Sequence, residues 1–189
     1  VAKGKSYKSD ELQPSRTALV TLKSFLRGGG YREDGLKEYV GEYKPEQVVH
    51  PGEVVVAFTD VTQAAEVIGR PARVRADGRY STLVASLDVG IVRPTAPELP
   101  PEYLYYCFLE PSFTDHTYAH ANGSTVLHLA AGAVEKYEGI WPDPRVASAF
   151  VEIVSPLLKR QDANWTECDT LARLRDTLLP KLLSGELHV

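Results

Sequence analysis

The chain has 189 residues, of which 43% are hydrophobic and 24% are charged, a composition typical of a soluble folded protein. This length accommodates one domain of ordinary size plus an extension. The sequence contains no apolar run of the roughly 18–20 residues that span a bilayer and no apolar signal region, so we expect a cytoplasmic protein. The formal net charge of −4 is poor for a protein that holds DNA alone, because DNA binding requires phosphate neutralisation.

The two cysteines, Cys107 and Cys168, lie in different segments. Their separation excludes a disulfide framework and a Cys-x-x-Cys metal or redox site, and both are predicted to be small buried hydrophobic residues. The sequence has no Met, even at position 1. This is compatible with a removed initiator and equally with a piece of a longer chain.

The first half of the chain has the pattern of many short strands. Residues 18–27 are predicted to form a strand that ends at Gly28-Gly29-Gly30, whose missing side chains permit a tight reversal. His50-Pro51-Gly52-Glu53 predicts a turn between β-branched runs at 48–49 and 54–58. Further strands are expected at 67–68, 72–74, 83–87 and 90–92. Such close spacing favours an irregular, mostly antiparallel sheet.

Helical spacing of apolar and aromatic residues predicts a helix at 102–109, with Pro101 in its first turn, and a shorter helix at 130–136. The body is therefore predicted to be α+β, with the helices packed on the sheet. Asp143 and Pro144 signal the start of a long helix. We expect this helix to kink at Pro156, to end at Pro180 and to project from the body.

Mostly apolar side chains recur every seven residues along the long helix, and this spacing is typical of helices that pair in a coiled coil. Gln161 and Asn164 cost stability in such a seam but can fix its register. The chain is therefore divided into a body at 1–142 and a helical arm with a docking segment at 143–189. The residues expected at the subunit interface are Phe150, Val154, Leu157, Gln161, Asn164, Cys168, Leu171, Leu174 and Leu178.

The sequence lacks the motifs of cofactor-dependent enzymes. The three consecutive glycines do not have the spacing of a dinucleotide fingerprint, and there is no phosphate-binding loop, nucleophile elbow or Asn/Asp-Pro-Pro-Tyr element. Asp34, Glu42 and Lys44 imitate the acidic pair and lysine of a Mg²⁺-dependent nuclease, but such a triplet also arises by chance in a stretch rich in Glu and Lys. We therefore expect no catalytic residue and no cofactor in this chain.

A zinc site is the second metal site that the sequence could form. His116 and His120 are spaced to bind one ion, together with Asp115 or His128, if their segment is helical. The Asn122-Gly123 turn argues against a rigid helix there. Surface or partner-contact histidines are the favoured interpretation, and no metal site is predicted.

Polar, basic and aromatic residues gather in the loops between the predicted strands. Arg and Lys can address phosphates or guanine edges, Gln and Asn can address adenine edges, and Ser and Thr can address either. Loop solvation and turn capping explain any single one of these residues equally well. The set predicted to contact DNA is Arg27, Tyr31, Arg32, Lys37, Lys44, Thr62, Gln63, Arg79, Tyr80, Ser81, Asn122, Ser124 and Thr125.

Five segments in chain order resemble the specificity subunits of type I restriction-modification systems: 4–7, 52–63, 86–94, 123–129 and 174–187. The resemblance implies a DNA target recognition domain followed by a long spacer helix. It also implies a non-catalytic protein that reads one half of a split target in double-stranded DNA. The implied partners are modification (methyltransferase) subunits and a restriction subunit, and S-adenosylmethionine, ATP and Mg²⁺ are implied on those partners.

The family's full subunit usually carries two recognition domains and two long helices. The resemblance therefore leaves two arrangements open: the C-terminal half of such a subunit, or a half-length subunit that pairs with a second copy of itself. Gly185-Glu186-Leu187 looks like a natural chain end. Two other functions also stay open, namely a metal-dependent nuclease and a coiled-coil adaptor whose body binds protein. No motif encodes the DNA half-site or the methylated base.

Overall fold

The computed structural model describes residues 1–62, 64–96 and 99–187, and the chain divides into two compact units, Val1–Val151 and Glu152–Val189. The first unit contains small β-sheets and two packed helices, so the predicted α+β class is confirmed. The helix α3 (Pro144–Leu183) begins in the first unit and makes up most of the second. Among the described residues, no helix has the length and apolar character that crossing a membrane requires.

The described strands form three sheets, whereas a single sheet was predicted. The first sheet has the order β1-β9-β5-β7 and is antiparallel throughout, with β1 (Ala2–Lys3), β9 (Val89–Val92), β5 (Val54–Ala57) and β7 (Pro71–Arg73). The second sheet has the order β3-β2-β8-β4, with β3 (Lys37–Glu38), β2 (Thr17–Val20), β8 (Thr82–Ala85) and β4 (Val48–Val49). Only β2 and β8 pair in parallel in these described sheets. The third sheet joins β10 (Ala121–Asn122), β11 (Leu127–Leu129) and β6 (Thr59–Asp60).

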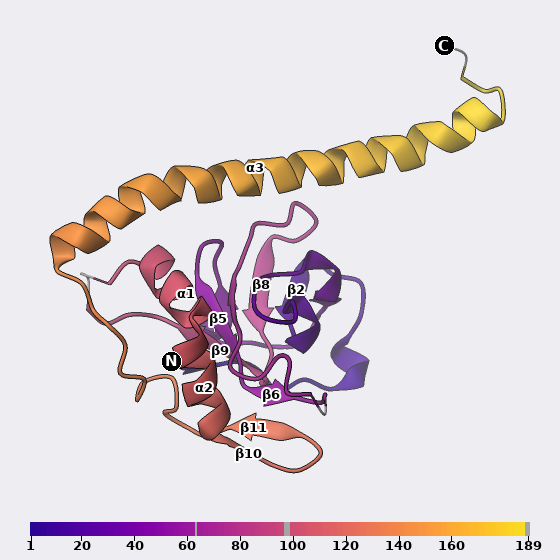
Figure 1. Ribbon diagram of the computed structural model, residues 1–189. Coiled ribbons are helices and arrows are strands. Elements are labelled where there is room, and N and C mark those ends of the chain that lie inside the picture. Colours follow the sequence, from indigo (N-terminus) through magenta and orange to yellow (C-terminus); the bar gives the residue numbers. More distant parts are fainter. Residues whose placement is uncertain (63, 97–98, 188–189) are drawn as a thin grey trace. The chain divides into compact units, whose positions relative to one another are not determined.

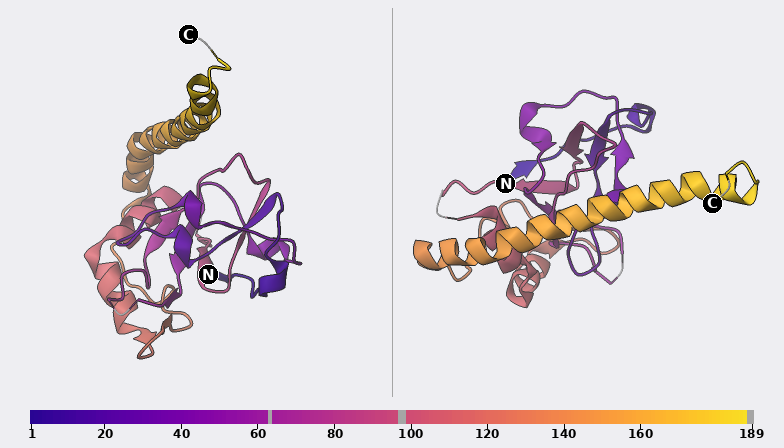
Figure 2. Two further views of the ribbon diagram at one scale, coloured as in Figure 1. Left: turned by 90° about the vertical axis from the view of Figure 1, so that its right-hand side faces the viewer. Right: turned by 90° about the horizontal axis from the view of Figure 1, so that it is seen from above.

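The first sheet lies between the second sheet and the two packed helices (Figure 1). Val55 and Ala57 of β5 face a core shared with β2 and β8, while Val54 and Val56 pack with residues of α1 and α2. In the left view of Figure 2, the pink helices α1 and α2 lie on one side of the body and the indigo segments around β2 lie on the other. Burial on both faces explains why β5 is an unbroken apolar run rather than an alternating one.

The packed helices are α1 (Pro101–Leu109) and α2 (Pro111–Ala119). The predicted helix at 102–109 is confirmed, with Pro101 at its start, whereas α2 was not predicted. The two helices share an aromatic cluster in which the rings of Phe108 and Phe113 stack with centroids 4.0 Å apart. The predicted helix at 130–136 is wrong, because hydrogen-bonded turns occupy this segment and Gly132 adopts a φ of 76°.

Two predicted strands also need correction. The strand expected at 18–27 ends at Val20, because the Thr21 side chain accepts a hydrogen bond from the Lys23 amide and caps the short 3-10 helix Leu22–Ser24. Residues 67–68 form no strand, because their amides donate to the Asp60 carboxylate. Further 3-10 helices lie at Ser9–Glu11, Glu33–Gly35 and Pro45–Gln47.

Both predicted turns are present. Gly28, Gly29 and Gly30 have φ values of 82°, 105° and 111°, and the Leu26 amide donates to the Gly30 carbonyl at 3.0 Å, which closes the reversal. At the second turn, the Glu53 amide donates to the His50 carbonyl at 3.0 Å. This turn connects β4 of the second sheet with β5 of the first, so it carries the chain from one layer to the next.

The helix α3 has 40 residues, about 60 Å at 1.5 Å per residue. Its predicted start is confirmed, since the Asp143 carboxylate accepts a hydrogen bond from the Arg145 amide at 2.9 Å. The predicted end at Pro180 is wrong, because α3 runs through both Pro156 and Pro180 to Leu183. Figure 1 shows α3 as one long helix. The chain leaves the helix near Gly185, whose φ of 75° provides the left-handed residue that commonly ends helices.

Candidate DNA interface

Four loops of the body are linked through a series of contacts, and we call this set the loop rim. They are the glycine loop (26–35), the segment that follows β6 (61–62 and 64–69), the turn at 75–81 and the hairpin tip at 122–125. The Gly28 amide donates to the Glu66 carbonyl at 3.4 Å, and Arg79 Nη2 donates to the Glu33 carbonyl at 3.4 Å. The hairpin tip joins this series because β11 pairs with β6. The fold thus brings together most of the loops that were predicted to contact DNA.

A groove runs along the glycine loop. Its floor depends on Gly35, because a Cβ there would lie 2.1 Å from the Lys23 carbonyl carbon, while the Thr21 hydroxyl donates to the Gly35 carbonyl at 3.0 Å. The lining mixes cationic and apolar side chains, which suits a surface that contacts both phosphates and base edges. The residues of this groove are Lys23, Phe25, Leu26, Arg27, Arg32, Asp34, Gly35 and Val67.

Each predicted arginine of the loop rim is paired with a carboxylate. Arg27 Nε lies 3.0 Å from Glu66 Oε2, Arg79 Nη2 lies 2.6 Å from Asp77 Oδ2, and Arg32 pairs with Asp34. The hydrogen bond from Arg32 lowers the pKa of the Asp34 carboxyl, and the hydrogen bonds that Arg79 donates to Asp77 raise the pKa of Arg79. A guanidinium has five N–H donors, so such a pair fixes its direction and leaves other donors for a ligand.

The remaining predicted contact residues of the loop rim are mostly open to solvent. Asn122, Ser124 and Thr125 are exposed at the hairpin tip, and Ser81 is exposed with its hydroxyl 3.2 Å from the Arg16 carbonyl. Tyr80 is half-buried beneath Arg79, whose guanidinium carbon lies 5.2 Å from the ring centroid. The half-buried Thr62 accepts a hydrogen bond from the Glu66 amide at 3.3 Å. Gln63 lies outside the described residues.

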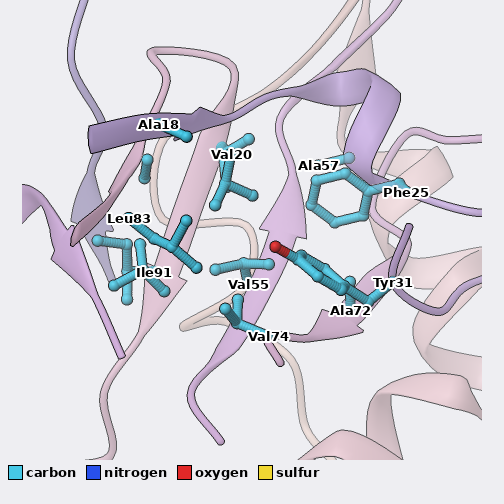
Figure 3. Packing of buried hydrophobic residues seen from close by; sticks show 13 residues of the cluster. Ala18, Val20, Phe25, Tyr31, Val55, Ala57, Ala72, Val74, Leu83 and Ile91 are labelled. Carbon is cyan, nitrogen blue, oxygen red and sulfur yellow. The ribbon is translucent and has the colours of Figure 1, made fainter. Parts of the chain in front are cut away.

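Three of the predicted residues lie apart from this surface. Tyr31 is only 7% exposed, and its hydroxyl points toward Val55 in the core between the sheets (Figure 3), so it supports the glycine loop from beneath. Burial, reinforced by Glu33, raises the pKa of Tyr31. Lys37 donates to the Tyr7 hydroxyl at 3.0 Å, and the exposed Lys44 lies 3.9 Å from Glu46. Neither Tyr7 nor Glu46 belongs to the loop rim.

Sequence reasoning missed three residues of this region. Lys23 lines the groove, Glu66 binds Arg27, and Asp60 holds the segment that carries Glu66. For Asp60 a signal was available, since an Asp that directly follows a strand often bonds the backbone two residues on. Glu66 and Lys23 are charged loop residues like many others, and only the fold shows their neighbours.

The histidines are placed differently from the prediction. His116 lies within α2, so this segment is helical after all, and the rings of His116 and His120 have centroids 4.3 Å apart. His116 Nε2 lies 2.8 Å from the Ala133 carbonyl oxygen, and His128 Nδ1 lies 3.4 Å from the Thr59 hydroxyl. No group of three or more His, Cys, Asp or Glu residues that could hold a metal ion is found in the described ranges. The nuclease hypothesis gains no support from Asp34, whose carboxylate is bound to Arg32.

The second unit presents the predicted interface residues along α3. Leu157, Gln161, Asn164 and Cys168 line a shallow groove with Arg160 and Trp165. Leu171, Leu174 and Leu178 follow and are 57%, 50% and 40% exposed. Two of the predicted residues are not presented in this way: Val154 is only 9% exposed, and Phe150 belongs to the first unit, where its ring makes edge contacts with Tyr103 and Tyr106 of α1. Contrary to the prediction, Cys168 is exposed in the open groove along α3, and Cys107 of α1 is only partly buried.

Comparison with known proteins finds relatives of one kind. The chain is 33% identical over 87 residues to the type I restriction enzyme HindI specificity subunit of Haemophilus influenzae. It is 32% identical over 87 residues to the type I restriction enzyme MjaIX specificity subunit of Methanocaldococcus jannaschii. Each match covers 46% of this chain. Over this stretch the chain is similar to type I specificity subunits.

These sequence matches support the resemblance that the sequence segments indicated, and a solved structure agrees with it in fold. The solved structure of the S subunit of a type I restriction-modification system from M. genitalium superimposes with a TM-score of 0.65 and 16% identity, over 97% of this chain and 42% of that one. At this identity the likeness shows a shared fold. The matches span only 19% and 20% of the two curated type I specificity subunits. No family model matches the chain.

Proposed function

We propose that this chain is a sequence-specific DNA recognition subunit, or part of one, of a type I restriction-modification enzyme, and that it reads one half of a split target. The observation that carries the proposal is the loop rim, where contacts link separate loops that carry paired arginines and exposed polar side chains. In this role residues 1–142 form the target recognition domain, and the chain performs no catalysis.

The electrostatics of the loop rim fit recognition within a larger complex. Arg27, Arg32 and Arg79 each have a carboxylate partner, and the whole chain carries a net charge of −4. Non-specific DNA binding depends on neutralising phosphates, so this chain alone should bind DNA weakly and with a small salt dependence. Modification subunits would then supply most of the positive surface that holds the duplex.

The helix α3 is proposed to be the spacer and the docking arm. Its open groove contains Leu157 beside polar side chains, and Leu171 and Leu178 are exposed further along the helix. A pairing helix that covered this side would remove all three leucines from water. Modification subunits, a restriction subunit or a second copy of this chain would be held there. S-adenosylmethionine, ATP and Mg²⁺ would be bound by those partners.

The experiment that tests this proposal is a methylation map. Genomic DNA is sequenced from cells that carry the modification subunit with this chain, the modification subunit alone, or the chain alone. We expect methylation at one split sequence only when both proteins are present. A modification subunit that keeps the same sequence preference without this chain would refute the proposal. Mg²⁺-dependent cleavage by the isolated chain would support a nuclease instead.

A further inference from the structure

A buried carboxylate lies where β6 enters the loop rim. Asp60, at the end of β6, is 1% exposed. Its Oδ1 accepts a hydrogen bond from the Thr62 amide at 2.7 Å, and its Oδ2 accepts from the amides of Val67 at 2.6 Å and Ile68 at 2.9 Å. Burial by itself raises the pKa of a carboxyl group, but these hydrogen bonds outweigh it, and the pKa of Asp60 lies below its usual range. The group is therefore an ionised anchor.

The segment that Asp60 closes has no strand or helix of its own among its described residues. Ala65 adopts a φ of 51°, a left-handed conformation that a residue with a Cβ holds only when its surroundings enforce it. The bonds from Asp60 enforce it from one side, and the Gly69 amide, which donates to the Ala57 carbonyl at 2.8 Å, fixes the far end. The backbone around residue 66 is thereby held in one place.

Glu66 lies in this segment and holds Arg27 across the loop rim. Glu66 Oε2 is 3.0 Å from Arg27 Nε, and Arg27 Nη1 donates to Glu66 Oε1 at 3.4 Å. The Gly28 amide adds a bond to the Glu66 carbonyl. The Glu66 side chain is 31% exposed and the Arg27 side chain is 76% exposed. The carboxylate thus orients a guanidinium that is open to solvent and lines the groove.

We propose that Asp60 is a positioning residue for DNA recognition, and that it sets the direction of Arg27 at the groove through the backbone of its loop and the carboxylate of Glu66. This inference rests on the proposed function, since it assigns Arg27 to the reading of DNA. This position requires a carboxylate, because both oxygens of Asp60 accept hydrogen bonds from backbone N–H groups. An asparagine would offer only one acceptor oxygen and would place an N–H donor against a backbone N–H group.

The test is a double-mutant cycle in the full chain assembled with its modification subunit. The single variants are Arg27→Ala, Glu66→Gln and Asp60→Asn, and the last two are also combined with Arg27→Ala. Glu46→Gln serves as a matched control, since it removes a carboxylate from the exposed pair with Lys44 away from the groove. The dissociation constant is measured for the methylated target sequence and for a shuffled duplex at one salt concentration.

Arg27→Ala is expected to lower the preference for the target about tenfold, the size of one lost base contact. Glu66→Gln and Asp60→Asn should lower it in the same direction, and neither should lower it further once Arg27 is absent. A purely structural role for Asp60 would instead add its loss in full to the Arg27→Ala background, and this result would overturn the inference. An unchanged preference in Glu66→Gln would overturn it too, because glutamine has the shape of glutamate and the half-buried side chain can be replaced without disturbing the fold.

Hydrogen exchange of the free chain distinguishes the two proposed steps, namely that Asp60 fixes the backbone of the loop and that Glu66 orients Arg27. Asp60→Asn should speed exchange of the Val67 and Ile68 amides, while Glu66→Gln should leave these amides protected and still lower the preference. Protection of both amides that is unchanged in Asp60→Asn would refute the anchor. A wild-type complex that selects no DNA sequence would overturn the proposed function and this inference together, whereas a selective complex with additive variants would overturn this inference alone.

Discussion

Replacing Leu171 and Leu178 of α3 by aspartate is expected to abolish association with a modification subunit and to leave the body folded. The two leucines lie seven residues apart on one side of the helix and are 57% and 40% exposed. In the free chain their loss removes little buried surface. The cost there is the lower helix propensity of Asp, about 0.5 kcal/mol per residue.

In an assembled complex the same substitutions should be far more costly. Burying a whole leucine contributes about 1.5–3 kcal/mol, and roughly half of each side chain is still exposed, so covering the pair would contribute about 1.5–3 kcal/mol. Two carboxylates in an apolar seam add a desolvation cost of at least similar size. The sum of about 3 kcal/mol or more corresponds to a dissociation constant about a hundredfold higher or beyond.

The assay is co-elution from a sizing column, followed by titration calorimetry against the modification subunit. Thr166→Asp with Thr177→Asp is the matched control, because both threonines are exposed on the opposite side of α3 and the added charge is the same. The control pair should bind as the wild type does. Unchanged co-elution of the leucine variant, or equal loss in both variants, would refute the assignment of this face.

Three further results are expected. Phe113→Ala should lower the free energy of unfolding by about 3–5 kcal/mol in a denaturant titration, because the ring is fully buried and stacks on Phe108; a loss below 1 kcal/mol would contradict the packing. Because folding lowers the pKa of Asp60, its stabilisation is present above the unfolded value of about 4 and is lost as pH falls through the lower folded value. The difference in urea midpoint between wild type and Asp60→Asn should therefore shrink below about pH 4, and a constant difference would speak against an ionised anchor. In the assembled complex, Arg32→Ala should lower the affinity for DNA, because Arg32 lines the groove, whereas Lys44→Ala should leave this affinity unchanged. If both variants bind DNA with the same affinity, the groove is not part of the DNA interface.

The sequence predicts those elements whose signals are local. Pro101 and Asp143 mark the starts of α1 and α3, and Gly28-Gly29-Gly30 and Pro51-Gly52 mark reversals, because each depends on the backbone preferences of adjacent residues. The parallel pairing of β2 with β8 and the separation into three sheets depend on partners far apart in the chain. No local pattern encodes those partners.

The errors in the helices have a similar origin. α2 lacks a strong periodic pattern and owes its place to tertiary packing, since Phe113 is fully buried and stacks on Phe108. Pro180 is a local stop signal that costs one hydrogen bond, and α3 nevertheless continues to Leu183. For the loop rim, residue types predicted the surface loops, but only the fold shows that Tyr31 points inward and that Glu66 meets Arg27.

The central claim is that the body of this chain selects the DNA target. It is tested most directly by exchanging residues 1–142 for the recognition domain of another type I specificity subunit, keeping 143–189, and mapping methylated sites in cells that carry the same modification subunit. A changed target is expected: one half changes if the chain is part of a two-domain subunit, and both halves of a palindrome change if it pairs with itself. An unchanged methylation motif would contradict it.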